Sequence, residues 1–303
     1  MSVLTIFTAP KPFEDAHINI IQRNAILSWL SLGASVQVLL VGDEFGTSQV
    51  AQEYAIQHLP QVSCNAYRTP LVSSIFELAR RHSDSPLLAY INADIIVLPD
   101  FLAVARQVQM QLQRFLLVGQ RWDLDLPVPL DFSPGWQEAL QAEVQLHGRL
   151  HQPAGSDYFI FPRELYLDLP AFAIGRAGWD NWMIYHGVHQ PWPVIDATQA
   201  VTVIHQNHDY HHMPDGRVHY GSDETLTNAK LGGGMQNMYM ILDTNKELRD
   251  GQIRAPAPRL IRLVRRLERA LQPSGDEVGG GPRWWFTRRL RRLRRALVGS
   301  RET

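Results

Sequence analysis

The stretch Leu87-Leu-Ala-Tyr-Ile-Asn-Ala-Asp-Ile-Ile-Val-Leu-Pro-Asp100 decides the fold, because an apolar strand in it ends on polar residues. Asn92 and Asp94 follow directly where that strand ends. Ligands of open α/β sheets bind outside the carboxyl ends of the strands. We therefore predict Asp94 as a ligand of a divalent metal ion, with Asn92 contributing an amide to the same bound molecule. The alternative is a polar cap between a strand and a loop.

The sequence on both sides of this stretch alternates short β-rich runs with amphipathic helical segments, which is typical of a mostly parallel sheet. We predict strands at residues 3–8, 35–41, 62–67, 86–91 and 115–119, and helices at 16–32 and 100–113. Beyond residue 120 we predict a loop at 122–134, followed by a helix that ends near residue 148. We also predict a helix at 179–186 and strands at 158–161 and 200–204. The predicted fold class is α/β, with a central sheet about five strands wide before residue 120.

The charge of the chain is divided between two segments of opposite sign. Residues 254–303 hold 14 arginines against four acidic residues, which gives +10 and leaves −11 on the preceding part within a total of −1. Proline and glycine at 255–258 and 279–282 indicate hinges. We therefore predict a domain at 1–250 and a basic tail at 251–303, and the charge of the tail favours an anionic partner.

The composition indicates the cell compartment. Cys64 is the only cysteine, so no intrachain disulfide can form. No run of about 18 apolar residues and no signal peptide is evident. We expect a cytoplasmic protein, held peripherally at the inner face of a membrane if the tail binds lipid.

Polar residues also follow the first two predicted strands. Thr8 and Lys11 lie after the first strand, and Asp43 lies after the second. Lys11 can meet a phosphate as a point charge, and Asp43 can accept hydrogen bonds from a base or ribose. Capping of a helix by Asp43 and an ordinary proline turn are equally good interpretations.

A helix start at residues 179–182, Trp-Asp-Asn-Trp, is a second candidate site. Asp180 at a helix N-terminus is a candidate general base, and Trp179 and Trp182, which flank Asp180 and Asn181, are candidates to stack against a ring of the bound molecule. The alternative is that Asp180 caps the helix while the tryptophans fill the core. Asp157, just before an apolar strand, is a further candidate hydrogen-bond acceptor or a turn residue.

Histidines are concentrated at residues 205–219, directly after a predicted strand. Imidazole binds Mn²⁺-like ions, so His205 or His208 can complete a metal site with Asp94. No His-Glu-x-x-His motif, paired cysteines, Gly-x-Gly-x-x-Gly after a strand, phosphate-binding loop or nucleophile elbow is present. The motifs typical of zinc hydrolases, NAD-binding proteins, P-loop proteins and α/β-hydrolases are therefore missing, and the sequence does not favour these classes of protein.

Four segments in order resemble a family of nucleotide-diphospho-sugar transferases across roughly residues 3–245. They are residues 90–94, 155–159, 175–182 and 204–210. The resemblance implies a GT-A (Rossmann-like) fold, a nucleotide-sugar donor and Mn²⁺ or Mg²⁺ as cofactor. It also implies that Asp94 and His205 hold the metal and that Asp180 is the base. The usual Asp-x-Asp of the family is Asn-Ala-Asp in this chain.

The resemblance therefore predicts a metal-dependent glycosyltransferase that moves a sugar from a UDP- or GDP-sugar to a hydroxyl of a glycan or lipid-linked acceptor. Two alternatives stay open. A catalytically silent nucleotide-sugar or glycan-binding module is consistent with Asn92 in place of a carboxylate, and a nucleotide-sugar hydrolase would use water as acceptor. The sequence leaves open the sugar, the stereochemical course and the oligomeric state.

The tail contains two amphipathic helical segments. In the first, Leu260, Val264, Leu267 and Leu271 share a face, and residues 286, 290, 293 and 297 repeat that spacing after the aromatic group 284–286. Arginines between apolar residues favour a helix that lies in a membrane interface over one that docks on the acidic body. Nucleic acid ranks last as a partner, because no recognised binding motif accompanies the arginines.

Overall fold

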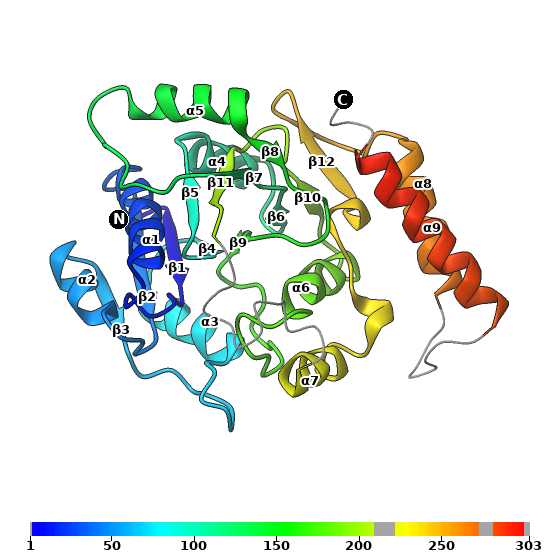
Figure 1. Ribbon diagram of the computed structural model, residues 1–303, viewed down its shortest axis with the longest axis horizontal. Coiled ribbons are helices and arrows are strands. Elements are labelled where there is room, and N and C mark those ends of the chain that lie inside the picture. The colour runs from blue at the N-terminus through cyan, green and yellow to red at the C-terminus, as the bar shows by residue number, and fades with distance from the viewer. Residues whose placement is uncertain (1, 209–221, 273–280, 300–303) are drawn as a thin grey trace.

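The structure consists of one large sheet, one small sheet and surrounding helices; this computed structural model describes residues 2–208, 222–272 and 281–299 (Figure 1). The large sheet contains β1 (Leu4–Thr8), β2 (Val36–Val41), β3 (Gln57–Leu59), β4 (Leu87–Ile91), β6 (Leu116–Val118), β9 (Tyr158–Pro162), β10 (Val194–Asp196), β12 (Lys246–Arg249) and β13 (Gln252–Arg254). The small sheet contains β5 (Ile95–Val97), β7 (Trp122–Leu124), β8 (Arg149–Leu150) and β11 (Val203–Gln206). The helices are α1 (Ala16–Leu30), α2 (Thr47–Glu53), α3 (Val72–Arg81), α4 (Asp100–Gln111), α5 (Trp136–His147), α6 (Trp179–Val188), α7 (Asp223–Leu231), α8 (Leu260–Leu271) and α9 (Pro282–Gly299), with single 3-10 turns at η1 (Met235–Asn237) and η2 (Ile241–Asp243).

The large sheet is mostly parallel, which confirms the predicted fold class. Its strand order is β13-β12-β10-β6-β9-β4-β1-β2-β3, and within it only β9 and β13 run antiparallel to their neighbours. Before residue 120 it has β1, β2, β3, β4 and β6, as many strands as predicted. The insertion of antiparallel β9 between β4 and β6 is the feature that the periodicity did not reveal.

Helices cover both faces of the large sheet, and the alternation of side chains along each strand explains why. In β4, Leu87, Ala89 and Ile91 belong to the apolar cluster shared with α1, α2 and α4. Leu88 and Tyr90 point the other way, into the cluster shared with α3 and α6. A strand that is buried on both faces reads as a continuous apolar run, which is why β4 is visible in the sequence.

The strand predicted at residues 62–67 is wrong. The third strand of the parallel set is β3 at Gln57–Leu59, and the chain turns where the strand was expected. The side chain of Asn65 accepts hydrogen bonds from the backbone N–H groups of Tyr67 and Thr69, and Arg68 adopts a positive φ of 64°. An asparagine whose side chain accepts hydrogen bonds from backbone N–H groups later in the chain competes with strand pairing. The segment therefore forms a turn in spite of its β-rich composition.

Helix α8 packs on the body, and α9 packs on α8. Arg265 of α8 lies 2.8 Å from Asp243, and Arg262 lies 3.2 Å from Asp196. Glu268 of α8 in turn pairs with Arg291 and with Arg294 of α9, at 3.0 and 2.8 Å. The structure therefore shows the docking alternative for α8, with α9 held on the body through α8, and the division of the chain at residue 250 stays a prediction. None of the described helices combines the length and apolar character needed to span a bilayer.

We expect the Asp243→Ala variant to lose about 3 kcal/mol of unfolding free energy, because its carboxylate is the buried partner of the Arg265 guanidinium. The side chains of Arg265 and Asp243 are only 4% and 1% exposed. The control is Glu53→Ala, which breaks an ion pair with Arg23 in which Glu53 is half exposed, and it should cost about 1 kcal/mol or less. Urea denaturation measures both, and equal losses would contradict the docking described above.

Candidate active site at the end of strand β4

Strand register brings the predicted metal ligands together. After β4 the chain turns through Asn92 and Asp94 into β5, and β11 pairs antiparallel with β5 so that His205 lies opposite Ile95. The backbone N–H of Gln206 donates to the carbonyl of Asp94 at 3.3 Å. This pairing places His205 beside Asp94, although the two residues are far apart in the sequence.

Asp94, His205 and His208 form a cluster in which one ligand atom of each lies within 4.8 Å of the others. The Nε2 atoms of His205 and His208 lie 3.8 and 3.3 Å from Asp94 Oδ2. The other oxygen, Asp94 Oδ1, is buried and has no hydrogen-bond partner among the described residues. An oxygen with no partner beside two imidazole nitrogens fits a divalent transition ion. The remaining histidine-rich residues, 209–221, lie outside the described part of the chain.

The electrostatics of the cluster keep Asp94 ionised and disfavour protonation of His205. Burial acts to raise the pKa of Asp94, but His205, His208 and Lys11 outweigh it and hold that pKa well below its ordinary value. Burial, above all, lowers the pKa of His205. Lys11 Nζ lies 3.4 Å from His208 Nε2, so the predicted phosphate-binding lysine is part of the same cluster. Metal ligands must be deprotonated, so these shifts favour metal binding near neutral pH.

A second layer of charged residues supports the cluster, and sequence reasoning missed it. His205 Nδ1 lies 3.5 Å from Asp123, and Asp123 accepts a hydrogen bond from Arg121 at 2.8 Å and contacts His151 at 2.7 Å. Arg121 also donates to Asp157, at 2.8 Å. A carboxylate behind a ligating histidine orients the imidazole ring. The alternation Trp-Asp-Leu at 122–124 is the only signal that marks β7 as a strand within the predicted loop.

Asn92 holds Asp157 in place. The Nδ2 of Asn92 donates to Asp157 Oδ1 at 2.8 Å, and its backbone N–H donates to the Asp157 carbonyl at 2.9 Å. The Asn92 amide oxygen accepts the Tyr90 hydroxyl at 3.0 Å. Both ends of the amide are therefore engaged by the protein, and contact of Asn92 with a nucleotide stays a prediction.

Asp180 is the second residue of helix α6, whose N-cap Gly178 has a φ of 110° that favours glycine. The loop that carries Asp157 passes so close that a Cβ on Gly155 would overlap Asp180 Oδ2. Burial, with a smaller contribution from Asp157, raises the pKa of Asp180 to about 6, even though backbone N–H groups stabilise its charge. Asp180 thus differs from Asp94, because its charge changes near neutral pH.

The two tryptophans beside Asp180 lie in the core, which was the alternative interpretation, whereas Asn181 is partly exposed; contact of these residues with a bound molecule stays a prediction. Trp179 is 6% exposed and packs edge-on against Tyr90, with ring centroids 4.9 Å apart. Trp182 is 8% exposed and stacks on His186 at 4.7 Å. Asn181 donates to the carbonyls of Ala154 and Tyr239. Helix α6 is apolar on several sides, and its two tryptophans pack against other aromatic side chains.

The structure does not bring the two other strand-end residues to the cluster. Thr8 is fully buried at the end of β1, and its hydroxyl has no hydrogen-bond partner among the described residues. Asp43 is exposed after β2. A role of either residue in nucleotide binding stays a prediction.

The similar proteins found are solved structures; no family model matches the chain, and no curated protein is similar to it in sequence. Glucosyl-3-phosphoglycerate synthase from Mycobacterium tuberculosis, with Mn²⁺, UDP and phosphoglyceric acid, shares 16% identity and a TM-score of 0.47 over 77% of this chain and 79% of that chain. The Mg²⁺ and UDP complex of that synthase shares 16% identity and a TM-score of 0.42 over 68% and 72%. S. aureus TarS with UDP-GlcNAc shares 11% identity and a TM-score of 0.45 over 77% and 71%. These are glycosyltransferases, the class that the four sequence motifs resemble, but at such values they carry no weight in assigning chemistry to this chain.

We expect Mn²⁺ to bind the purified protein and the Asp94→Asn variant to lose this binding, because the variant removes the only carboxylate of the cluster. Asp123→Asn should weaken binding by roughly 10- to 100-fold, since it removes the support behind His205. Asp84→Asn, a change at an exposed carboxylate, is the matched control and should bind as the unmodified protein does. Electron paramagnetic resonance of free Mn²⁺ measures all of them, with Mg²⁺ and Zn²⁺ as competitors. Equal Mn²⁺ affinity in Asp94→Asn and Asp84→Asn would rule out this site.

Proposed function

We propose that this protein is a metal-dependent glycosyltransferase that moves a sugar from a UDP- or GDP-sugar to a hydroxyl of a glycan or lipid-linked acceptor. The observation that carries the proposal is the convergence of Asp94, His205, His208 and Lys11 at the carboxyl end of β4. A divalent ion held there would neutralise a diphosphate and make it a better leaving group. Lys11 would add a positive charge for the same phosphates.

Two carboxylates with different environments support separate roles. The pKa of Asp94 is held low, so Asp94 stays ionised and serves as a ligand. The pKa of Asp180 is raised to about 6, so Asp180 is largely ionised at neutral pH but remains basic enough to accept the proton of an attacking hydroxyl. Carboxylates whose pKa values are pushed apart indicate the division between electrostatic and acid–base roles.

The environment of Asp180 favours an enzyme over a silent binding module. Holding nucleotide-sugar alone requires no carboxylate with a raised pKa, whereas Asp180 is kept in such a state beside Asp157. A nucleotide-sugar hydrolase would use the same residues with water as the acceptor. The products separate these cases, because a hydrolase releases free sugar without any acceptor and a silent module releases none.

The donor is tested by calorimetric titration with UDP, GDP and their sugar conjugates, with and without Mn²⁺. We expect one nucleotide to bind tightly only when Mn²⁺ is present, because Asp94 and the two histidines hold the ion against the diphosphate. Asp94→Ala should abolish this dependence, and Asp84→Ala should leave it intact. Failure of every nucleotide to bind in the presence of Mn²⁺ would refute the proposed donor site.

Once a donor is known, the pH profile tests Asp180. We expect kcat/KM to rise about tenfold per pH unit below a pKa near 6 and to level off above it, because only the ionised carboxylate accepts a proton. Asp180→Asn should lower kcat by roughly 10²- to 10⁴-fold and remove this limb of the profile. Asp168→Asn, at an exposed carboxylate, is the control. A limb that persists in Asp180→Asn would assign the base to another residue.

A further inference from the structure

The arginines of the two tail helices fall into two sets. One set makes ion pairs with the body or between the helices, and consists of Arg262, Arg265, Arg269, Arg291 and Arg294. The other set makes no ion pair within the described residues, and consists of Arg259, Arg266, Arg283, Arg288, Arg289, Arg292 and Arg295. Docking therefore accounts for only part of the positive charge of the tail.

Exposed apolar side chains accompany the unpaired arginines. On α8, Leu260, Leu263 and Leu267 are 59%, 54% and 47% exposed and recur at helical spacing. On α9, Trp285 and Phe286 are 49% and 52% exposed. The exposed leucines of α8 differ from the predicted apolar face in one position, because Val264 packs inward while Leu263 points outward. We call these exposed apolar residues, together with the unpaired arginines, the tail surface.

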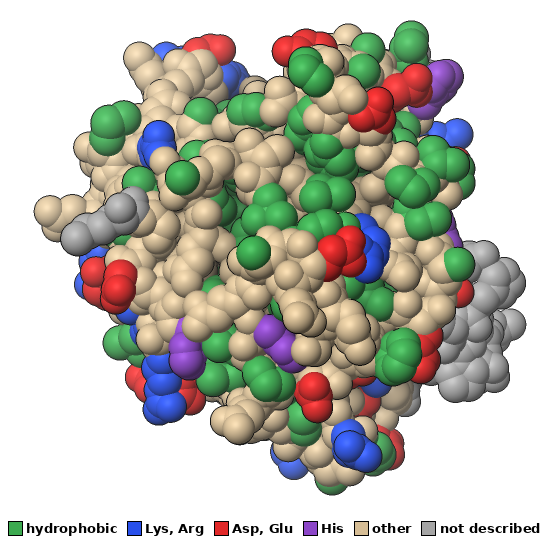
Figure 2. All heavy atoms as spheres, turned by 90° about the vertical axis from the view of Figure 1, so that its left-hand side faces the viewer, with side chains coloured by type: hydrophobic (Ala, Val, Ile, Leu, Met, Phe, Trp, Pro, Cys, Tyr) green, Lys and Arg blue, Asp and Glu red, His purple; other side chains and the backbone are tan. Residues whose placement is uncertain are grey.

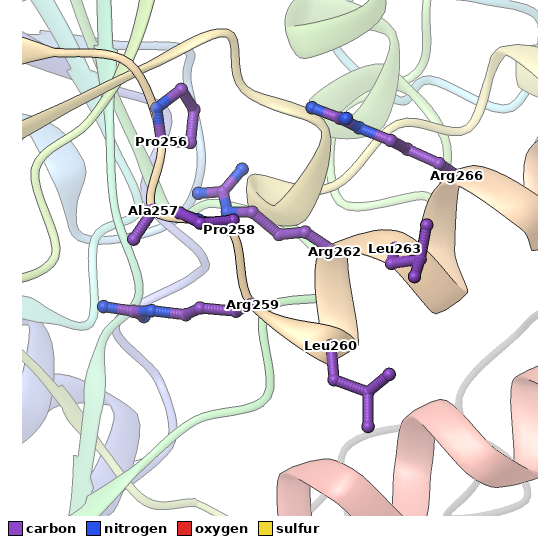
Figure 3. Close-up of a pocket in the computed structure, with 8 residues that line it drawn as sticks. All are labelled: Pro256, Ala257, Pro258, Arg259, Leu260, Arg262, Leu263 and Arg266. Atoms are coloured by element: carbon purple, nitrogen blue, oxygen red, sulfur yellow. The ribbon is translucent and has the colours of Figure 1, made fainter.

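A hollow at the start of α8 combines both kinds of side chain (Figure 3). The linker Pro256–Pro258 and the first turns of α8 line it, and Arg259 and Arg266 extend toward the same side of it. Arg262 also lines the hollow but is engaged with Asp196. Arg259 and Arg266, which make no ion pair among the described residues, line the hollow together with Leu260 and Leu263, and this combination suits a phosphate group that is attached to an apolar chain.

The opposite face of the molecule differs in character. There, acidic and basic side chains are interspersed and the histidines are scattered among them (Figure 2). The body as a whole carries −11, against +10 on residues 254–303. An anionic surface is therefore attracted to the tail side and repelled elsewhere, which would orient the protein.

We propose that the tail surface binds an anionic lipid membrane while α8 and α9 stay docked on the body. Tryptophan and phenylalanine beside arginine are typical of helices that lie at the headgroup level, and Arg289 lies 3.9 Å from the ring centroid of Trp285. The unpaired arginines meet lipid phosphates, and the exposed leucines and aromatic rings enter the headgroup boundary. The paired arginines keep the body attached at a defined orientation. This proposal does not depend on the chemistry of the β4 site.

The test is co-sedimentation of the full chain with vesicles of phosphatidylcholine alone or mixed with phosphatidylglycerol. We expect binding only to the mixed vesicles, with an affinity that falls as salt is added. The triple variant Arg288→Gln, Arg289→Gln and Arg292→Gln should lose on the order of 100-fold in affinity, since each arginine near an anionic surface contributes to binding. Its matched control removes three exposed arginines of the body, in Arg68→Gln, Arg114→Gln and Arg149→Gln, and should bind normally.

A second pair of variants tests the apolar contribution. Trp285→Gln with Phe286→Gln should weaken vesicle binding at every salt concentration, whereas Met110→Gln with Leu146→Gln, at apolar positions of the body that are even more exposed, should not. Thermal unfolding of each variant shows whether it is folded. Equal binding to both kinds of vesicle, or equal loss in tail and control variants, would overturn the proposal. Two further results would also overturn it. One is self-association of the protein, measured by sedimentation velocity, that only the tail variants abolish. The other is binding of the protein to duplex DNA but not to vesicles.

Discussion

A carboxylate removed from water costs free energy unless positive groups compensate it, and this constraint organises the site around Asp94. Its side chain is 14% exposed, and the groups that compensate it come from distant parts of the chain: Lys11 from the loop after β1, and His205 and His208 from β11 and the residue beyond it. Asp123 then stands behind His205, and Arg121 links Asp123 to Asp157. Groups of opposite charge therefore alternate from one layer to the next, while Asp94 Oδ1 and His205 Nδ1 keep no hydrogen-bond partner among the described residues.

The insertion of β9 extends this arrangement to Asp180. Because Tyr158 pairs with Ile91, Asp157 must lie beside Asn92, and the glycine that precedes it can pass close to the start of α6. Asp180 is thereby partly buried and lies near a second negative charge, and its partial burial, more than that charge, raises its pKa. The same small region therefore holds one carboxylate ionised and another poised to exchange a proton.

The sequence predicts those parts of the fold that have a strong local signal. Strands β1, β2 and β4 are apolar runs that end within a residue or so of their predicted limits. The polar residues at the end of β4 pointed to Asp94, which lies beside His205 and His208, and its role as a metal ligand stays a prediction. The sequence could not predict residues whose roles depend on long-range strand pairing. Asp123, for example, lies beside His205 only because β7 pairs with β11. The sequence left open whether Trp179 stacks on a bound molecule or fills the core, because the apolar surface of α6 does not reveal which side faces the sheet. The Asn65 turn was missed because its hydrogen bonds override the β-rich composition around it.

The central claim is that Asp94 and the two histidines hold a divalent ion against a nucleotide diphosphate. Diffraction from crystals grown with Mn²⁺ and UDP, recorded at the manganese absorption edge, tests it most directly. The claim predicts one anomalous peak within coordination distance of Asp94 and His205, with the diphosphate on the side of Lys11. An anomalous peak elsewhere, or UDP bound away from the end of β4, would contradict it.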